Sequence, residues 1–506
     1  MTSPANTRLP ISDDVEAVLP AAISRAHDWL KSTADEEDKA TEQLADLLRD
    51  EDGVKFTMDF VDRVMRPEDD KVAAHALKDI SSHYDPSFLG SINGALVGAG
   101  GFFGPILPNL VMPIARLYMR KMVGHLVLDA ESDALNKILD KAAESGEQLN
   151  LNLLGEAVLG EEEAKSRAER TLKLIQNPRV TYVSVKASSM VAQLNPWDID
   201  GSVERLKERL RPLYQAAADR TEKVFINMDM EEYHDLHLTI RLFKELLSEP
   251  EFLTLDAGIV LQAYLPDTFD ALKDVADFAK ERVAKGGGKV KVRIVKGANL
   301  SMETVQGEVH DWPLATYTNK LDVDANYYRL LDFILRDEYA DSVRICVATH
   351  NLYTAAMAYE LGKKRGVLHM MDSEMLQGMS PAQQAAVRKV FDGRQILYTP
   401  VVHAEDFDVA VSYLVRRLEE NSAPQNFLYA LFAPGEEPLA DQEETFRRAV
   451  AKRWETFAGA RRTQNRLEDS GRQAPDSGRF RNEPDTDPAI TPNRTWAKRA
   501  LANDPG

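Results

Sequence analysis

Cysteine is almost absent from this sequence: Cys346 is the only one in 506 residues. Disulfides within the chain are therefore excluded, and iron–sulfur chemistry is excluded because there are no cysteine clusters. The 10 histidines form no HExxH pattern, so no metal site is expected. This low cysteine content is typical of a protein that resides in a reducing cytoplasm.

Long runs of Lys and Arg are also missing before the C-terminal tail. The sequence has 81 acidic and 62 basic side chains, and its formal net charge of −19 repels nucleic acid and anionic lipid overall. Acidic residues also outnumber basic ones in the first 50 residues, so we expect no binding to nucleic acid. The N-terminus has no basic start followed by an apolar core, so no secretory signal is expected.

One segment, from Pro86 to Ala115, contains no charged residue and is long enough to span a bilayer. Pro105, Pro108 and Pro113 interrupt it, together with several glycines. We therefore expect a buried helical hairpin rather than a membrane span. Peripheral contact of this segment with a bilayer stays open.

The chain changes character near residue 180. Residues 1–175 are mostly helical in pattern, with apolar residues recurring every three and four positions at 15–50 and 162–176. After residue 180, short β-rich runs alternate with amphipathic stretches such as 201–220 and 268–285. These runs lie at 181–187, 223–229, 258–264, 291–297, 343–349, 366–372 and 395–400.

Strands separated by helices pair in parallel, and seven or eight such units in about 250 residues fit a closed barrel better than an open sheet. We predict an α/β fold: an α-helical N-terminal domain over residues 1–175, then a (β/α)8 TIM-like barrel over 176–457. Residues 458–506 are polar and rich in Pro and Gly, and we expect a linker or tail that cannot bury a core alone.

Polar residues recur at the C-terminal ends of the predicted strands, where barrels of this kind hold their active sites. A single such residue could cap a strand or lie in a solvated loop, but polar ends on six strands in succession favour one converging site. The residues are Lys186, Asp229, Gln262, Arg293, Lys296, Gly297, Thr349, His350, Asn351 and Tyr398.

A second group lies on a predicted helix, where Arg416 and Arg417 are adjacent and diverge by about 100° around the axis. Tyr413 and Glu420 lie about one turn to either side. Two interpretations remain open for this group. It could be a solvated face with helical salt bridges, or a clamp of guanidinium groups that binds a carboxylate.

Two further patterns do not support a site. The glycines between residues 98 and 104 suggest a dinucleotide-binding loop, but they follow no predicted strand and lack its spacing. Ser188 and Ser189 lack the surrounding residues of a nucleophile elbow.

Several segments, in order over residues 180–434, resemble the proline dehydrogenase family. They are VSVKAS (183–188), NMDMEEY (227–233), GIVLQAYLPD (258–267), RIVKGANL (293–300), ATHN (348–351), EMLQGM (374–379), YTPVV (398–402) and YLVRRLEEN (413–421). Residues 155–167 resemble the segment before the barrel in the bifunctional proline utilization A proteins. Residues 480–497 resemble the start of their aldehyde dehydrogenase half. We therefore expect this chain to correspond to the proline dehydrogenase portion of such a protein.

The resemblance implies a distorted (β/α)8 barrel that binds FAD non-covalently without a dinucleotide fingerprint. It implies oxidation of L-proline to Δ1-pyrroline-5-carboxylate, the first step of proline catabolism to glutamate, with a quinone reoxidising the flavin. It is compatible with a cytoplasmic protein that contacts the inner face of the cell membrane peripherally. Hydroxyproline or a related cyclic amine remains an alternative substrate, and a flavin-free barrel is a further alternative.

The resemblance also implies roles for single residues. Arg293 resembles the arginine beside N5 of the isoalloxazine ring. The other residues that resemble the flavin-contacting set are Asp229, Gln262, Val295, Lys296, Gly297, Ala298, Thr318, Thr349, His350 and Asn351.

For the substrate, Arg416 and Arg417 resemble the pair that grips the carboxylate of proline, with Lys186 as a third cation. The remaining pocket residues by resemblance are Asp229, Leu376, Tyr398, Tyr413 and Glu420. A cationic clamp and an apolar slot are what a zwitterion with an apolar ring requires. One departure concerns Asn299 and Leu300, which stand where many family members have aromatic residues, and it puts the preference for proline over hydroxyproline in doubt.

Overall fold

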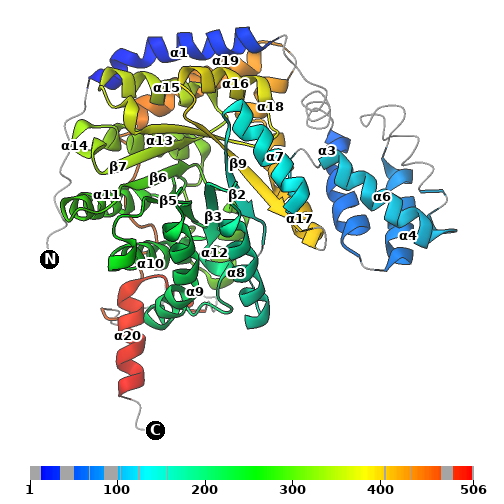
Figure 1. Ribbon diagram of the computed structural model, residues 1–506, viewed down its shortest axis with the longest axis horizontal. Coiled ribbons are helices and arrows are strands. Elements are labelled where there is room, and N and C mark those ends of the chain that lie inside the picture. The colour runs from blue at the N-terminus through cyan, green and yellow to red at the C-terminus, as the bar shows by residue number, and fades with distance from the viewer. Residues whose placement is uncertain are drawn as a thin grey trace, which may run out of the picture.

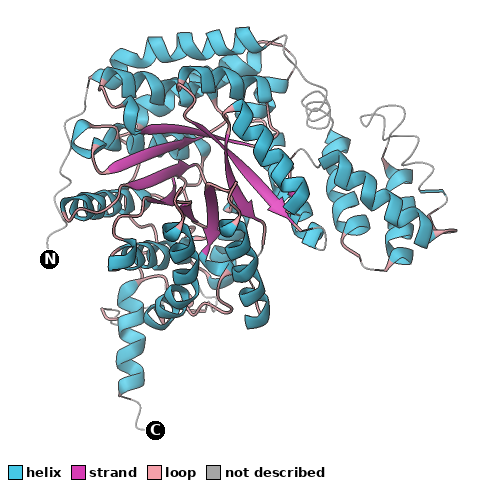
Figure 2. Ribbon diagram, viewed as in Figure 1, coloured by secondary structure: helices cyan, strands magenta, loops and turns pink. Residues whose placement is uncertain are grey.

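The computed structural model describes residues 13–34, 51–67, 69–84, 101–102, 104–123, 126–130, 132–155, 158–403, 406–433, 435–468 and 482–503. Its centre is a closed barrel of eight parallel strands surrounded by helices (Figures 1 and 2). The predicted α/β barrel with a helical segment before it is therefore confirmed.

The barrel closes because β9 pairs with β8 on one side and with β2 on the other. A strand of two residues, β1 (Leu128–Asp129), pairs with the far end of β9. The barrel strands are β2 (Gln148–Leu153), β3 (Tyr182–Lys186), β4 (Phe225–Asp229), β5 (Ala257–Gln262), β6 (Val290–Val295), β7 (Val343–Ala348), β8 (Met371–Leu376) and β9 (Gln395–Val402).

The sequence prediction missed β2, the first strand of the barrel. The boundary expected at residue 176 therefore falls after β2 and after the helix that follows it, α8 (Glu161–Gln176). In β2 leucines alternate with Gln148, Asn150 and Asn152, so the strand does not show the continuous apolar run expected of a buried parallel strand. Both asparagines are nevertheless buried, because their amides hydrogen-bond inside the barrel.

The other predicted strands are found within a few residues of their expected positions, except one. The run at 366–372 was expected to be a strand, but it begins with a 3₁₀ turn, η6 (Leu368–Met370), and β8 starts only at Met371. Gly366 has a φ of +72°, which ends the preceding helix in a left-handed turn that a strand cannot include.

Helices cover the barrel on its outer face, as parallel strands require. They are α7 (Ser132–Ser145), α8, α9 (Ile199–Asp219), α10 (Leu236–Leu247), α11 (Thr268–Ala284), α12 (Leu300–His310), α13 (Lys320–Ile334), α14 (Asp337–Ala340), α15 (Leu352–Lys364), α16 (Pro381–Val390), α17 (Phe407–Ser422), α18 (Phe427–Phe432) and α19 (Glu437–Lys452). Short 3₁₀ turns are η3 (Ala187–Ser189), η4 (Tyr233–Asp235) and η5 (Pro250–Phe252). The first helix, α1 (Asp14–Thr33), lies against α15 and α16 (Figure 1).

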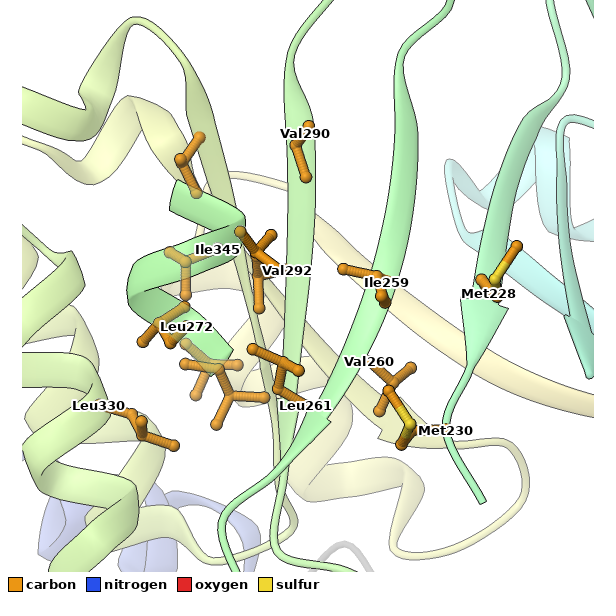
Figure 3. Close-up of a cluster of buried hydrophobic side chains, with 14 of the residues drawn as sticks. Met228, Met230, Ile259, Val260, Leu261, Leu272, Val290, Val292, Leu330 and Ile345 are labelled. Carbon is orange, nitrogen blue, oxygen red and sulfur yellow. The ribbon is translucent and has the colours of Figure 1, made fainter. Parts of the chain in front are cut away.

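The apolar core lies between the strands and these helices (Figure 3). Ile259 and Leu261 of β5 are buried there with Val292 of β6, and they pack with Leu272 of α11 and Leu330 of α13. Each fully buried side chain of this kind contributes about 1.5–3 kcal/mol relative to an exposed one. The alternate positions of the same strands face the barrel interior and include Gln262, Lys291 and Arg293, so the interior carries polar side chains that can form a site.

A helical arm precedes the barrel and packs on α17 (Figure 1). It consists of α3 (Glu51–Phe60), a π-helical turn η1 (Val61–Met65), α4 (Asp70–His83) and α6 (Pro108–Val123). Phe60, Val64 and Leu77 of the arm share one apolar cluster with Tyr413 and Leu414 of α17. The arm therefore supports the helix that carries the predicted arginine pair.

The expectation of a buried hairpin at 86–115 is wrong for the part that the structure describes, and residues 86–100 lie outside it. Met112 of α6 is buried against the arm, but Leu110 and Ile114 are each 60% exposed. Among the α6 side chains that the structure describes, Met112 is covered, whereas Leu110, Ile114 and Leu117 are exposed. Within the described ranges, no helix is both long and apolar enough to cross a membrane.

The C-terminal tail lies against the barrel domain instead of extending freely. The Arg462 guanidinium lies between two rings, 5.1 Å from the centroid of Tyr233 and 4.9 Å from that of Trp312, and pairs with Asp487 at 3.3 Å. The last helix, α20 (Thr491–Ala502), is tied to the start of α9 by a 2.7 Å ion pair between Lys498 and Asp200. The tail buries few apolar side chains and docks through polar contacts, as its composition requires.

Candidate active site

Arg293 of β6 is the central side chain at the mouth of the barrel. Its Nη2 donates to Asp229 Oδ1 at 2.8 Å and its Nη1 donates to Glu374 Oε1 at 2.8 Å. The Arg293 guanidinium also lies 4.9 Å from the centroid of the Tyr398 ring. Burial alone would lower the pKa of Arg293, but the two carboxylates outweigh it and raise the pKa, so the group is permanently charged.

Asp229 lies at the C-terminal end of β4 and accepts from several donors besides Arg293. Asn227 Nδ2 donates to it at 2.9 Å, Asn152 Nδ2 at 3.2 Å and the Tyr398 hydroxyl at 3.2 Å. Burial and the neighbouring Asp229 charge raise the pKa of the Tyr398 phenol, so Tyr398 acts as a hydrogen-bond donor. The predicted residues Asp229, Arg293 and Tyr398 thus form one connected group.

Lys186, at the end of β3, lies beside this group and pairs with Glu231 at 3.4 Å. Gln262, at the end of β5, donates from Nε2 to the backbone carbonyl of Glu231 at 3.0 Å. Its Oε1 is buried and has no hydrogen-bond partner within the described part of the chain. One acidic residue therefore joins two of the predicted strand-end residues.

The backbone after β6 makes a close turn at Gly297. Its φ is +125°, and a Cβ atom at this position would lie 2.4 Å from the ring of Tyr264, so only glycine fits. The Tyr264 amide donates to the Lys296 carbonyl at 2.7 Å, which fixes residues 295–298 against the end of β5. Lys296 pairs with Asp324 at 2.6 Å, and burial lowers the pKa of its ammonium group to about 8.

Thr349, His350 and Asn351 follow β7 and are held by hydrogen bonds to their own surroundings. The Leu376 amide donates to His350 Nε2 at 2.9 Å, and burial lowers the pKa of His350 to about 4, so the ring is neutral at pH 7. Asn351 caps α15, since its Oδ1 accepts from the Thr354 amide at 3.2 Å. These contacts give the loop a fixed shape.

Helix α17 brings the second group of predicted residues to the same mouth. Arg417 Nη1 donates to Glu420 Oε2 at 2.6 Å, and the Arg417 guanidinium lies 5.4 Å from the centroid of the Tyr413 ring. Burial raises the pKa of the Tyr413 phenol, while Arg417, Arg416 and Arg293 act to lower it. Three cations from α17 and β6 are therefore within electrostatic reach of one phenol.

Apolar contacts complete this arrangement. Leu376 and Tyr398 from the rim pack in the same cluster as Tyr413 and Leu414. The side chain of Arg417 is only 18% exposed, so Arg417 does not lie on a solvated helix face. The Arg417 guanidinium therefore lies beside the cluster that Tyr413 forms with the strand ends.

Two positions lie at the edge of this site. Thr318 is exposed in the loop before α13. Leu300 is 51% exposed in the first turn of α12.

Several residues of the site were not predicted: Glu231, Glu374, Cys346, Asn150 and Asn152. Glu374 precedes the predicted Leu376 by two positions on β8, so it shares that residue's orientation one layer deeper in the barrel. For the strand residues among them, the signal that could have identified them is the period of two in each strand, extended inward from the rim. Glu231 lies beyond β4, two positions after Asp229.

The residues at the mouth are suited to hold a flavin. Buried polar atoms without a hydrogen-bond partner in the described ranges include Arg293 Nε, Gln262 Oε1 and Arg417 Nε. Orphaned buried polar atoms are costly unless a bound group satisfies them. Among the described residues, no three His, Cys, Asp or Glu side chains are grouped so that they could bind a metal ion.

A family model described as proline dehydrogenase matches residues 134–430. The solved structure of proline utilization A from Corynebacterium freiburgense is 46% identical, covers 97% of this chain and 39% of its own, and has a TM-score of 0.71. The structure from Bdellovibrio bacteriovorus, inactivated by N-propargylglycine, is 26% identical, with coverage of 96% and 48% and a TM-score of 0.74. A variant from Bradyrhizobium japonicum is 20% identical, with coverage of 89% and 49% and a TM-score of 0.61, which shows the fold alone.

This chain thus spans less than half the length of each of these three proline utilization A structures. None of the curated proteins matches it.

Proposed function

Because this chain belongs to the proline dehydrogenase family, a family of oxidoreductases, we propose that it oxidises L-proline to Δ1-pyrroline-5-carboxylate with FAD as the hydride acceptor. The observation that carries the proposal is the meeting of Arg417 on α17 and Arg293 on β6 around the Tyr398 and Tyr413 rings. A small amino acid needs a cationic group for its carboxylate and an apolar wall for its ring, and this arrangement offers both.

The proposed substrate site uses the residues of α17 and the rim. Arg416 and Arg417 bind the carboxylate of proline, and Glu420 holds Arg417 from the side through its ion pair. Leu376 and Tyr413 contact the pyrrolidine ring. Lys186 adds a third cation, whose charge is partly balanced by Glu231 at 3.4 Å.

The proposed cofactor site lies between this pocket and the barrel. Arg293 Nε and Gln262 Oε1 would satisfy their missing hydrogen bonds on the polar edge of the isoalloxazine ring. The backbone of residues 295–298, Asp229, Thr318 and the loop of Thr349, His350 and Asn351 complete the proposed contacts. Lys296 offers positive charge to the phosphates of FAD. When bound, FAD supplies the acceptor for the hydride that leaves C5 of proline.

Anaerobic addition of L-proline to the purified, flavin-loaded chain tests the proposal. We expect the yellow protein to lose its flavin absorption, and trans-4-hydroxyproline at equal concentration to bleach it more slowly. A protein that binds FAD but is not bleached by proline would contradict the proposed substrate. Faster bleaching by hydroxyproline would favour the alternative cyclic-amine activity, which Asn299 and Leu300 keep open, and purified protein that binds no flavin would favour a flavin-free barrel.

We further propose that a membrane quinone reoxidises the flavin and that α6 gives the chain its peripheral contact with the bilayer. Ile106, Leu107, Leu110, Ile114 and Leu117 are each at least 50% exposed and lie on one side of this helix or just before it. An exposed apolar stripe of this size is typical of an interaction surface.

The charges around the stripe favour an anionic lipid surface. No Asp or Glu occurs from residue 86 to residue 128, whereas the sequence of α6 contains Arg120 and Lys121, together with Arg116, which pairs with Asp70 at 2.7 Å. The remainder of the chain is strongly acidic and would be repelled by such a surface, so the uncharged and basic segment is the part suited to approach it.

Sedimentation with vesicles of mixed neutral and anionic lipid tests this contact. We expect Leu110→Asp with Ile114→Asp to abolish co-sedimentation. Val305→Asp with Val309→Asp, which alters two apolar residues of α12 that are 57% and 70% exposed, should leave it unchanged. No binding of the wild-type chain, or a loss of dimers in the arm variant, would contradict the lipid assignment and favour a second copy of the chain as the partner.

A further inference from the structure

Arg293 is held by two carboxylates that come from opposite sides of the barrel. Asp229 of β4 and Glu374 of β8 each accept from one terminal nitrogen of the guanidinium at 2.8 Å. Both acids and the arginine are at most 6% exposed. Since each terminal nitrogen is bound, Nε is the nitrogen of this guanidinium that lacks a partner in the described part of the chain.

Glu374 has further donors, all below the mouth. Asn150 Nδ2 of β2 donates to its Oε1 at 3.2 Å, and the Cys346 thiol of β7 donates to its Oε2 at 3.1 Å. Burial and the Glu374 charge raise the pKa of Cys346, so the thiol stays protonated and remains a donor. These contacts fix the carboxylate in one place beneath Arg293, to which it also bonds.

The layer beneath offers an internal comparison. Asp372 lies two residues before Glu374 on β8, about 6.6 Å along the strand. It pairs with Lys291 at 2.8 Å and with Arg344 at 2.6 Å. At the level of Asp372, one carboxylate is therefore paired with two cations. At the level of Arg293, one cation is paired with the two carboxylates of Asp229 and Glu374.

We propose that Glu374 is a positioning residue: it holds the Arg293 guanidinium jointly with Asp229, and its negative charge lowers the reduction potential of the flavin bound above. The inference rests on the proposed function, since it requires FAD at the mouth. Reduction adds negative charge to a flavin, and a buried anion close to the ring opposes that charge more strongly than an exposed one would. A carboxylate that only stabilised the fold would leave the potential unchanged.

The charge can be removed with little change of shape by Glu374→Gln. We expect the flavin of this variant to have a more positive midpoint potential. The ratio of reduced to oxidised flavin at a fixed potential should rise at least tenfold, which is about 30 mV for a two-electron couple. The measurement is a redox titration of the bound flavin against a reference dye, and it needs no turnover. A folded, flavin-loaded Glu374→Gln protein with the wild-type potential would overturn the proposal.

Three further variants separate position from charge. Cys346→Ser keeps the carboxylate and changes one of its donors, so the potential should stay at the wild-type value. Asp372→Asn removes a carboxylate from the same strand one layer deeper, and its effect should be smaller than that of Glu374→Gln. Glu374→Asp keeps the charge one methylene further from Arg293, so it should restore most of the wild-type potential.

If Glu374→Gln fails to hold flavin, Glu374→Asp must still shift the potential in the positive direction by a smaller amount, and a shift in the negative direction would overturn the proposal. A wild-type chain that binds no flavin would instead contradict the proposed function. An equal shift in Asp372→Asn and Glu374→Gln would show a general effect of barrel charge and would overturn the specific role of Glu374.

Discussion

Arg417 is more firmly held than a surface arginine would be. Its ion pair with Glu420 at 2.6 Å and its position near the Tyr413 ring fix the guanidinium before any substrate arrives. A preorganised cation loses little conformational freedom on binding a carboxylate. The arginine pair is therefore expected to contribute directly to the affinity for proline.

We expect Arg417→Met and Arg416→Met each to raise the KM for proline about 10- to 150-fold, because a hydrogen bond to a charged group contributes roughly 1.5–3 kcal/mol. The flavin content of both variants should change little. Steady-state kinetics with an artificial electron acceptor provides the measurement. Arg447→Met is the control, since Arg447 is an exposed arginine paired with Glu443 on α19. An unchanged KM for proline in both α17 variants would show that Arg416 and Arg417 do not bind the carboxylate of proline.

Asp267, just after β5, is a buried acid with an unusual titration. Burial raises the pKa of its carboxyl to about 6, and the neighbouring Asp270 adds to the shift. The folded protein therefore binds this proton more tightly than the unfolded chain between about pH 4 and pH 6, so the contribution of Asp267 to stability falls as the pH rises through that window.

Asp267→Asn should remove the loss of stability that the ionised Asp267 carboxyl causes as the pH rises. At pH 7 we expect the variant to be more stable than the wild type, by at most about 3 kcal/mol, and the advantage should disappear below about pH 4. Thermal unfolding midpoints measured from pH 4 to pH 7.5 provide the test. The exposed neighbour Asp270, paired with Lys273, serves as the control in Asp270→Asn. A variant less stable than wild type at pH 7 would show that the charged form of Asp267 is favoured by its surroundings.

The turn after β6 depends on a glycine for two separate reasons. Gly297 has a positive φ, and its backbone lies directly against Tyr264. Gly286, at the end of α11, also has a positive φ, of +79°, but a Cβ atom there would meet nothing within 4 Å. Substitution of Gly286 therefore tests backbone strain alone, whereas substitution of Gly297 tests backbone strain together with steric contact.

Gly286→Ala should cost about 1 kcal/mol of stability, from strain alone. Gly297→Ala should cost more and should also lower flavin content, because the Tyr264 ring or the 295–298 backbone must move. Urea unfolding and the ratio of flavin to protein absorbance would be measured for both. Equal stability and equal flavin content in the two variants would show that the contact with Tyr264 is not restrictive.

Predicted strands such as β6 and β7 carry β-branched residues at their outward positions, although Lys291 and Arg344 are polar near the starts of these strands. For β4, β5, β6 and β7 an apolar run marks the strand and a polar residue marks the rim, so both fold and rim residues could be predicted. In β2 the asparagines extend along the interior and interrupt the run, which is why the first strand was missed.

The site residues below the rim could not be predicted from a single sequence, because their contacts depend on how neighbouring strands are aligned. Glu374 and Cys346 become partners of each other only because β7 and β8 pair in the register Ala348 with Glu374. Periodicity predicts which way each side chain points, but the register between strands decides which polar groups meet. The site residues assigned by resemblance to the flavin and to proline stay predictions until a ligand is bound.

On the side of the barrel near α1, one acid joins four helices. Asp332 of α13 accepts from Arg365, just after α15, at 2.6 Å, from Arg453, just after α19, at 2.9 Å and from Trp454 Nε1 at 2.8 Å. The same arginines pair with Asp14 and Glu16 of α1. Burial would raise the pKa of Asp332, but its donors outweigh it and lower the pKa, so the acid is charged at pH 7.

Asp332→Asn should destabilise the protein by about 3–5 kcal/mol at pH 7, because it leaves two buried guanidinium groups short of charge. The difference from wild type should shrink as the pH falls below about 4, since Asp332 has a lowered pKa and its contribution is lost when the wild-type acid is protonated. Guanidinium-chloride unfolding at several pH values is the measurement. Asp140→Asn, which breaks an exposed pair with Arg179, should have no measurable effect. Equal behaviour of the two variants would contradict the role of Asp332.

The barrel is sealed by contact between β2, at 148–153, and β9, at 395–402, and this pairing affects synthesis of the chain. While the ribosome is still translating the intervening residues, β2 has no partner on one side and the growing sheet keeps two open edges. Open edges of apolar parallel strands pair readily with other chains. We therefore expect the nascent protein to be most prone to aggregation until residue 402 is available for pairing, an interval set by the position of the final strand.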